Sequence, residues 1–576
     1  MICQGAHLAS AREGREGHVL LTERLGPLPI INHYLEKLDL EGALRQFVIP
    51  GTWRTRLDPV KGLLVLLRSM VVEREPIYRQ AETAATFAPR CFGLKKGDMP
   101  YLRDDTIGRA LDRLFDADRG SLLTEIVARL PDRFGVNFNE IHNDTTTIRF
   151  AGQYFPATGR SLRGKKAPWI TYGFSKDHRP DLKQLVFLLS TSEDGCVPIQ
   201  FRCENGNTND VSTHLATWYA IQKATGRSDF LYVADCKLCD RETMKEIDAK
   251  KGRFITVIPR SRGEDSFFRK KIQDFEVPWT TVWDRPNPRG KYKRRDVWKV
   301  WRDDIPSREA WPVTWVYGSL LAAHHDRLRH EHIQKVQEEL RDLQKRLLSK
   351  RRMRRTKADI WVLVKVLLAR YQVAEYLKVR LDPDPEYRYR QIGRGRPGPE
   401  TRYRRTIKRR WRLTWELDQK KIDYDAKSDG MYPLLSNDRN LTPRQVLEAH
   451  KRQPLLEKRF EQLKNVHEIA PVFLKNEGRI EAFFTLYFLA LLVQALIERD
   501  LRAAMKQEGI ESLPLYGEEM ACEMPTSLQI LRVFSLAERH VLYRKEEIID
   551  DFDIILTDLQ RQILKLLGLR DTIYSV

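Results

Sequence analysis

Three acidic residues lie where the folding of an α/β protein would bring their side chains toward one edge of a sheet. Asp144 lies in the run 141–148, on or beside an expected strand, although an Asp that hydrogen-bonds its own turn would look the same. Asp235 directly follows the apolar strand 230–234, and α/β sheets bind ligands at the carboxyl ends of their strands. Glu457 lies far downstream and, taken alone, would be an ordinary surface glutamate.

Taken together, the three carboxylates predict a site for divalent cations. Three such groups can hold two hard cations about 3.5 to 4 Å apart, which activate a water or a 3′-hydroxyl and stabilise the leaving oxygen of a phosphodiester. Mg²⁺ is the expected cofactor, and Mn²⁺ can substitute for it. Glu461, one helical turn beyond Glu457, is the competing third ligand. Asp229 and Asp240 compete less well with Asp235, because Asp240 is placed to cap a helix.

The charge balance favours a polyanionic partner. The chain has 576 residues, with 100 Lys and Arg against 79 Asp and Glu, a net charge of +21. Nucleic acid is the first candidate and an anionic membrane surface the weakest, because no helix combines a basic face with an interfacial aromatic face. A hydrophobic fraction of 42% with 31% charged residues is typical of a folded globular protein and excludes a disordered chain.

The seven cysteines are too sparse and unevenly spaced for a disulfide framework, which fits a reducing cytoplasm. Cys236 and Cys239 form a CxxC pair, and with Cys196 and Cys203 they form an alternative zinc site. That alternative is weak, because one pair would begin immediately beside Asp235.

No segment predicts export or membrane insertion. Residues 1–17 lack the apolar stretch of a secretory signal. The most apolar segment, 483–497, has 15 residues and contains Gln494, which is short of the roughly 20 residues that span a bilayer. We expect it to be a buried core helix of a cytoplasmic protein.

Hydrophobic periodicity predicts a helical region followed by a sheet. Apolar residues recur at helical spacing over 25–130, where one helix is expected to begin after Asp105 and Thr106, either of which can cap it. Six runs rich in β-branched and aromatic residues then predict strands at 141–150, 169–174, 185–190, 197–203, 230–234 and 254–258. Interleaved helices at 211–225 and 240–250 make this an α/β fold with a mixed sheet.

A long insertion separates this sheet from Glu457. Strands carrying four tryptophans are expected over 280–319, followed by a helical stretch at 321–381. Ile333, Val336, Leu340, Leu343 and Leu347 step by 3 and 4 residues, which predicts either a helical hairpin with the basic run 350–355 at its tip or an intermolecular coiled coil. Gly and Pro then mark 382–399 as a linker.

The most basic part of the chain begins within that expected linker. Residues 388–421 contain 13 Lys and Arg against 3 acids, interleaved with Tyr403, Trp411 and Trp415. A solvated face would have this composition too, but the sign bias and the aromatic residues favour binding to a phosphate backbone.

These motifs resemble the DDE transposases of bacterial insertion sequences, in the superfamily with the signature Tyr-(2)-Arg-(3)-Glu-(6)-Lys. Counted from Glu457, the lysine falls on Lys464, two helical turns away on the same face, whereas His450 and Gln453 stand at the Tyr and Arg positions. Four other segments are better preserved, at 143–147, 172–184, 206–210 and 233–235, of which Ser-Lys-Asp-His-Arg-Pro-Asp-Leu-Lys-Gln within the second is the most specific.

The resemblance implies an RNase H-like mixed-sheet core, interrupted by a long insertion domain and preceded by a helical N-terminal domain. Asp144 would lie on its first strand, Asp235 at the end of a neighbouring strand and Glu457 on a helix beyond the insertion, all three being catalytic residues and metal ligands. The interval of 222 residues between Asp235 and Glu457 agrees with such an insertion.

The same resemblance implies double-stranded DNA as the partner. Expected DNA-contacting residues are Lys464, His450, Gln453, Lys176, Arg179, Lys183, Arg404, Arg405, Arg409 and Arg410. The protein would bind the terminal inverted repeats of its element as a homodimer, cleave both ends with two metal ions and join them to target DNA. It would be cytoplasmic, prokaryotic and associated with the nucleoid. His142 and His178 are expected to make hydrogen bonds or DNA contacts rather than bind metal, and Trp298 or Trp301 to stack on a flipped base.

The expected organisation has six parts: an N-terminal tail at 1–24, a helical domain with possible DNA binding at 25–130, the first part of the core at 131–275, the insertion at 276–425, the second part of the core at 426–510 and a C-terminal helical segment at 511–576.

Two alternatives to a transposase stay open. One is an RNase H-like nuclease that cuts without joining, and the other, suggested by His450 and Gln453, is a catalytically inactive DNA-binding remnant of a transposase. Pro454 disfavours the α region at Gln453 and lacks the N–H of a helix interior, so the helix that carries Glu457 is expected to restart near Pro454.

Overall fold

The computed structural model describes residues 12–13, 18–152, 154–155, 157–287, 295–348, 356–408, 410–466, 474–544 and 547–575. These residues belong to two compact units. The first unit contains the described parts of Met1–Thr256 and Glu448–Val576, and the second contains those of Val257–Leu447. The insertion expected at 276–425 falls inside the second unit.

The first unit contains five strands of mixed direction in the spatial order β7-β6-β3-β8-β9. Their bounds are β3 (Glu140–Phe150), β6 (Lys183–Ser192), β7 (Pro198–Glu204), β8 (Leu231–Ala234) and β9 (Arg253–Val257). β3, β6 and β7 pair antiparallel, whereas β8 and β9 run parallel to β3. Helices α8 (His214–Thr225) and α9 (Arg241–Ala249) connect the later strands, and Asp240 caps α9 as expected. The α/β class is therefore confirmed, while the RNase H-like core stays a prediction.

The strand expected at 169–174 is wrong. That segment makes only isolated bridges, at Trp169 and Thr171, and two short strands, β4 (Ser161–Leu162) and β5 (Lys165–Lys166), precede it. The end of this segment passes so close to the backbone at Gly206 that a Cβ atom on Gly173 would lie 2.0 Å from the carbonyl oxygen of Gly206. This close approach requires glycine.

The core of the first unit is built around α16 (Glu477–Gln507), which packs against α1, α3, α5 and β7. Among the described residues, α16 is the one helix long and apolar enough to cross a bilayer, but 89% of its most apolar window is buried inside the protein. The prediction of a buried core helix at 483–497 is confirmed.

Helices cover 28–134 as the periodicity predicts. They are α1 (Leu28–Lys37), α2 (Leu40–Phe47), α3 (Pro59–Val72), α4 (Gln80–Ala85), α5 (Asp104–Asp116), α6 (Arg119–Ala128) and α7 (Leu130–Phe134). The cap expected for α5 is wrong: the helix begins at Asp104, so Asp105 and Thr106 lie inside its first turn, and Arg103 at the N-cap makes no capping hydrogen bond.

The two ends of the chain meet in a second small sheet. Its strands, in the order β1-β2-β20-β21, are β1 (Arg12–Glu13), β2 (His18–Arg24), β20 (Glu538–Arg544) and β21 (Glu547–Phe552). A tail at 1–24 and an all-helical segment at 511–576 were expected, but β2 pairs with β20 over seven residues. The remaining C-terminal elements are β18 (Leu513–Pro514), β19 (Ala521–Cys522), α17 (Ser527–Arg532) and α18 (Asp558–Leu566).

The second unit contains four antiparallel strands in the order β10-β11-β12-β17. These are β10 (Thr280–Pro286), β11 (Arg295–Arg302), β12 (Val313–Gly318) and β17 (Met431–Ser436), accompanied by α10 (Gly263–Asp274) and α13 (Gln419–Ala426). The tryptophan-bearing strands expected over 280–319 are confirmed.

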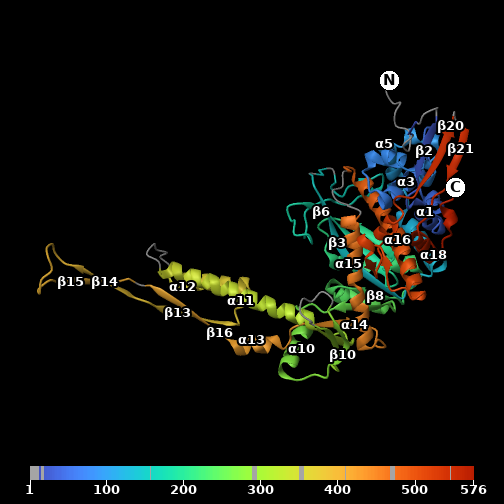
Figure 1. Ribbon diagram of the computed structural model, residues 1–576. Helices are drawn as coiled ribbons and strands as arrows, with labels where there is room; N and C mark the ends of the chain where they lie inside the picture. The colour runs from blue at the N-terminus through green and yellow to red at the C-terminus, as the bar shows by residue number, and fades with distance from the viewer. Residues whose placement is uncertain are drawn as a thin grey trace. The chain divides into compact units, whose positions relative to one another are not determined.

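A helical hairpin extends from this sheet. Helix α11 (Ser319–Leu348) packs along α12 (Lys357–Arg370), and strands β13 (Leu377–Pro383) and β16 (Trp411–Leu417) lie alongside (Figure 1). The apolar seam of α11 is buried against Ile360, Val364 and Leu368 of α12, which supports the hairpin rather than the intermolecular coiled coil. The helix expected to reach residue 381 ends at Arg370. The basic run 350–355, expected at the tip, lies outside the described residues.

Beyond β13 the chain forms a second two-stranded ribbon instead of a linker. β14 (Glu386–Gln391) pairs antiparallel with β15 (Tyr403–Lys408) over six residues. Only the turn between them, rich in Gly and Pro, keeps the irregular structure predicted for 382–399.

Candidate active site

Strand register brings Asp144 and Asp235 side by side. Asn143 of β3 pairs with Ala234 of β8, which runs parallel to it, so the next residue along each strand is one of the two aspartates. β8 ends there, and the Asp235 carboxylate accepts a hydrogen bond of 3.0 Å from the backbone N–H of Lys237, capping a short 3₁₀ turn. The two acids therefore lie at adjoining positions where β8 ends, although β3 continues past Asp144 to Phe150.

The Asp144 carboxyl group lies in an environment that disfavours its charge. Burial raises its pKa to about 6, against the nearby ammonium of Lys176, which lowers it. The carboxylates of Asp235 and Asp210 raise the pKa further, since each like charge opposes ionisation. A cation bound beside these carboxylates would offset their repulsion and favour the ionised form of Asp144.

Lys176 supplies a positive charge to this cluster. Its Nζ lies 3.6 Å from Oδ1 of Asp144 and 3.7 Å from Oδ2 of Asp210, and it donates to both the carbonyl and the hydroxyl of Thr145. The Thr145 hydroxyl in turn donates to Asp210 at 3.0 Å. The side chain expected to contact DNA thus lies among the acidic residues.

Two members of the cluster were not predicted. Asp210 begins a short helical turn, and His214 begins α8 four residues later. The Nε2 atom of His214 lies 3.8 Å from Oδ1 of Asp235 and is buried without a hydrogen-bond partner, while Nδ1 shares a hydrogen bond with the Tyr232 hydroxyl. Burial lowers the pKa of His214, against the pull of Asp235 and Asp210. The preserved segment 206–210 was the sequence signal for Asp210, and the spacing of four residues was the signal for His214.

The donor chemistry of the aspartate pair suits Mg²⁺, which prefers carboxylate oxygens and retains several waters. Asp144 and Asp235 supply such oxygens at adjoining positions. Within the described ranges, however, no three His, Cys, Asp or Glu side chains converge closely enough to bind one metal ion. The structure therefore brings two of the three expected ligands together and does not bring Glu457 to them.

Glu457 lies on α15 (Pro454–Glu461), an exposed position on a helix that packs beside β3. The helix begins at Pro454, as predicted, but Gln453 adopts α-helical angles (φ −55°, ψ −38°) although Pro454 follows it. Consequently α14 (Pro443–Arg452) and α15 are separated by Gln453 alone. Glu461 is also exposed, so burial does not distinguish it from Glu457.

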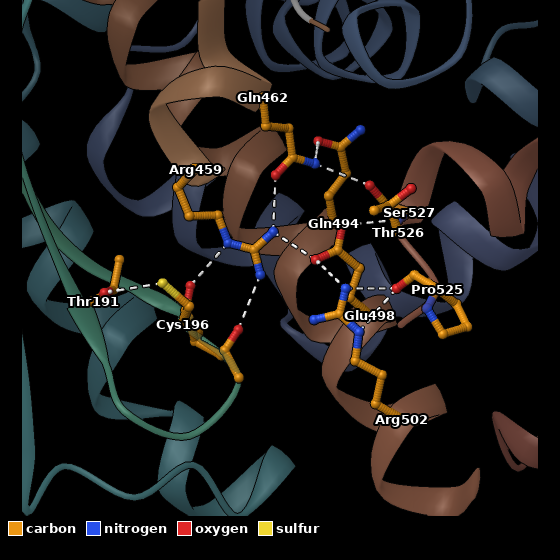
Figure 2. A network of polar contacts seen from close by, with 12 residues as sticks. Thr191, Cys196, Arg459, Gln462, Gln494, Glu498, Arg502, Pro525, Thr526 and Ser527 are labelled. Atoms are coloured by element: carbon orange, nitrogen blue, oxygen red, sulfur yellow. Dashed lines mark hydrogen bonds and ion pairs between the residues drawn. The ribbon is translucent and has the colours of Figure 1, made fainter. Parts of the chain in front are cut away.

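A buried arginine anchors the helix that carries Glu457. Figure 2 shows Arg459 of α15 pointing to Glu498 of α16, to which it donates a hydrogen bond of 2.6 Å. Arg459 also donates to the backbone carbonyls of Gly195 and Cys196 and to Gln462. Burial would raise the pKa of Glu498, but the charges of Arg459 and Arg502 hold it below its usual range. The orientation of α15 therefore depends on a buried ion pair.

Gln462 extends the same network. Its amide donates to Gln494 of α16 and to the hydroxyl of Ser527, both at 3.0 Å, and the backbone N–H of Ser527 donates to Glu498 (Figure 2). Helices α15, α16 and α17 and the loop at Gly195 and Cys196 thus share one network of hydrogen bonds.

His450 and Gln453 lie at the junction of α14 and α15. His450 is partly buried, and burial lowers its pKa to about 3, so the ring is neutral and offers no charge to a phosphate. Nearby, Arg452 donates two hydrogen bonds to Glu140, which also contacts His142 at 2.8 Å. His142 therefore has a hydrogen-bonding role, and DNA contact by His450 and Gln453 stays a prediction.

Lys464 forms an ion pair with the segment 172–184, one of the segments on which the resemblance rests. Its Nζ lies 2.9 Å from Oδ1 of Asp177, whose other oxygen lies 3.3 Å from Arg149. Arg179 makes a two-bond pair with Asp181. Lys183, at the start of β6, lies 5.6 Å from the centre of the Phe155 ring. Phosphate contacts by these side chains stay predictions.

The basic residues expected to contact DNA in the insertion lie on the ribbons. Arg404 and Arg405 are exposed on β15, and Arg410 pairs with Glu386, whereas Arg409 lies outside the described residues. Trp298 is 9% exposed and donates its indole N–H to Asp296. Its ring is therefore too buried in this structure to stack on a base.

The cysteines form no metal site in the part of the chain that is described. Cys91, Cys196, Cys203, Cys236, Cys239 and Cys522 are free thiols. The zinc alternative built on the CxxC pair therefore gains no support from the geometry.

No family model and no curated protein matches the chain. Among solved structures, it is similar to the piggyBac transposase in a synaptic complex with hairpin DNA, with a TM-score of 0.26 and 12% sequence identity. The match covers 51% of this chain and 61% of that chain, so it spans about three fifths of the transposase. This likeness to a transposase is too weak to assign a fold or a function to the chain.

Proposed function

We propose that the protein is a metal-dependent DNA transposase that cleaves phosphodiesters at the ends of a mobile element and joins them to target DNA. The observation that carries the proposal is the placement of Asp144 and Asp235 at adjoining positions of parallel strands, at the edge where β8 ends. Bound Mg²⁺ would polarise the phosphodiester and activate the attacking oxygen, with Asp144 and Asp235 among its ligands.

The residues around the acidic pair support a site for a charged polymer. Asp210 adds a third carboxylate to the cluster, and Lys176 balances part of the negative charge. The segment that leads to Lys176 carries the exposed aromatic residues Tyr172 and Phe174, at 57% and 86% exposure. Exposed aromatic rings beside cationic side chains are typical of surfaces that bind nucleic acid.

The remaining residues have positioning roles in this proposal. Arg459 and Glu498 hold α15 against α16, which sets the direction of Glu457 relative to β3. Lys464 and Asp177 tie the chain after α15 to the loop that presents Lys176.

Cleavage and joining of end-bearing duplexes in the presence of Mg²⁺ or Mn²⁺ tests the proposal. We expect Asp144→Ala and Asp235→Ala to reduce cleavage by at least about 10³-fold, because each removes a ligand from the reacting centre. Asp240→Ala is the matched control, since loss of this partly buried cap of α9 should leave the rate within about twofold while costing ~1 kcal/mol of stability.

The products separate the proposal from its alternatives. Strand-transfer products identify a transposase, whereas cleavage without joining identifies a nuclease. Cleavage that persists in both aspartate variants would show that the acids are misassigned. DNA binding with no metal-dependent cleavage would identify an inactive remnant. Glu457→Gln and Glu461→Gln, compared in the same assay, decide which glutamate serves as the third acid.

A further inference from the structure

The β14–β15 ribbon has two chemically different faces. In an antiparallel pair, residues opposite each other share a face and alternate residues point to opposite faces. The register therefore places Arg388, Arg390, Arg404 and Thr406 on one face and Tyr387, Tyr389, Tyr403, Arg405 and Ile407 on the other. Except for its first and last positions, β14 is exposed along its length, as is β15.

The basic face contains an unfavourable pair. Arg390 of β14 lies directly opposite Arg404 of β15, and like charges at such positions destabilise a ribbon. Glu386, the acid on the same face, is already engaged by Arg388 at 3.0 Å and by Arg410. The described turn after β14 adds Arg394 and Arg396, both exposed. An external anion would offset this repulsion.

Isolated two-stranded ribbons are marginally stable in water. Neither face of β14–β15 packs on a core, because Tyr387, Tyr389 and Ile407 on the second face are 51%, 64% and 55% exposed. A ribbon of this kind gains stability when a partner covers it, and its positive charge specifies a polyanion.

We propose that the β14–β15 ribbon lies in the major groove of duplex DNA, with its basic face toward the groove and Arg390 and Arg404 reaching phosphates on opposite walls. Two strands about 4.8 Å apart, with their side chains, fit a groove about 12 Å wide and do not fit the minor groove of about 6 Å. Repulsion between the two arginines directs them apart, which matches the placement of phosphates on either side of the groove. This inference rests on DNA as the partner in the proposed function and specifies the element that holds it.

Salt dependence of DNA binding tests the inference with the full chain. The probe is a fluorescent duplex of random sequence and about 30 base pairs, titrated from about 50 to 200 mM salt. Arg390→Gln/Arg404→Gln should weaken binding by about tenfold or more. It should also reduce the slope of log affinity against log salt by about 1.8, since each phosphate contact contributes about 0.9. Removal of the repelling pair should leave the fold intact.

Two double variants serve as matched controls. Tyr389→Gln/Ile407→Gln changes the opposite face of the same two strands, and Arg341→Gln/Arg346→Gln removes the same net charge from exposed positions of α11. Both should bind the duplex within about twofold of the parent with an unchanged salt slope. Loss of binding in the Tyr389 variant alone would indicate that the opposite face of the ribbon contacts the duplex, and it would overturn the inference. Equal loss in both arginine variants would indicate a general charge effect and overturn it too.

The proposed function and this inference fail in different ways. Unchanged affinity and slope in Arg390→Gln/Arg404→Gln, with cleavage intact, would remove the ribbon from DNA docking and leave the transposase proposal standing. Ribbon-dependent binding without any metal-dependent cleavage would do the reverse.

Discussion

The acidic edge of the first unit and the β14–β15 ribbon of the second both gather like charges, but they do so in opposite surroundings. At the acidic edge, burial raises the pKa of Asp144 to about 6, and Lys176 within the same chain supplies a counter-charge. On the ribbon, Arg390 and Arg404 face each other in solvent, without a core on either face. The first region is preorganised by the fold, whereas the second depends on a partner outside the chain for its compensation.

The largest expected effect on the free energy of unfolding comes from removing the buried ion pair between Arg459 and Glu498. Arg459→Met leaves Glu498 buried without its closest cation, which should lower the free energy of unfolding by about 3 to 5 kcal/mol. Urea denaturation measures the loss. Lys458→Met, a neighbouring exposed position on α15, is the matched control and should change stability by less than about 0.5 kcal/mol.

A double variant shows whether the buried pair is the cause. Arg459→Met/Glu498→Gln removes both charges, so it should recover part of the stability that Arg459→Met loses. If Arg459→Met were no more destabilised than Lys458→Met, the anchor of α15 would lie elsewhere. No comparable loss is expected on the ribbon, where Arg390→Gln/Arg404→Gln removes a repulsion.

A smaller effect of opposite sign is expected at the acidic edge itself. Burial holds the pKa of Asp144 near 6, above its ordinary value, so the folded state favours the protonated form and the charged form costs stability above pH 6. Asp144→Asn should therefore raise the free energy of unfolding by about 1 to 3 kcal/mol at pH 8 in metal-free buffer. The gain should fade as the pH falls from 6 toward 4, where the parent carboxyl group is protonated as well.

Denaturation of parent and variant across this pH range measures the gain. Asp240→Asn, at a helix cap that tolerates asparagine, should leave stability nearly constant over the same range. A destabilised Asp144→Asn variant at pH 8 would contradict the strained acidic edge. The same variant should lose cleavage, since the residue that costs stability is the one proposed to serve the reaction.

The aspartate pair was predictable because local patterns determine where strands end. An apolar β-branched run followed at once by Asp235 predicts both the strand and the edge where it ends. A similar run of β-branched residues predicts the strand that carries Asp144, although β3 continues past it to Phe150. The position of Glu457 relative to them was not predictable, because it depends on the packing of α15 across 222 intervening residues, and no local rule governs that packing.

Two other features were missed because the residue types involved are more common in a different kind of structure. Arginine is ordinarily exposed, so Arg459 looked like a surface residue, and its partner Glu498 was the one acid just after the apolar run 483–497. The ribbon was read as a linker because Gly and Pro dominate its turn, although the alternation Tyr387-Arg388-Tyr389-Arg390 has the period of a strand. Arg459 is buried because it pairs with Glu498, 39 residues away, whereas β14 and β15 pair across their own turn.

The smallest expected effect tests whether Lys176 is the internal counter-charge that distinguishes the acidic edge from the ribbon. Lys176→Met removes the ammonium 3.6 Å from Asp144, so the pKa of Asp144 should rise by a further one unit, approximately. The measurement is the pH above which the stability gain of Asp144→Asn becomes constant, because this pH corresponds to the pKa of Asp144 in the folded protein. It is compared in the parent and in the Lys176→Met background without metal. That pH should move upward from about 6 in the Lys176→Met background, since only the backbone N–H of Thr145 then opposes burial and the two neighbouring carboxylates. Lys250→Met, at the exposed end of α9, should leave it unchanged. An unmoved transition in Lys176→Met would mean that Lys176 is not the counter-charge of the acidic edge, and the contrast between the two regions would then rest on burial alone.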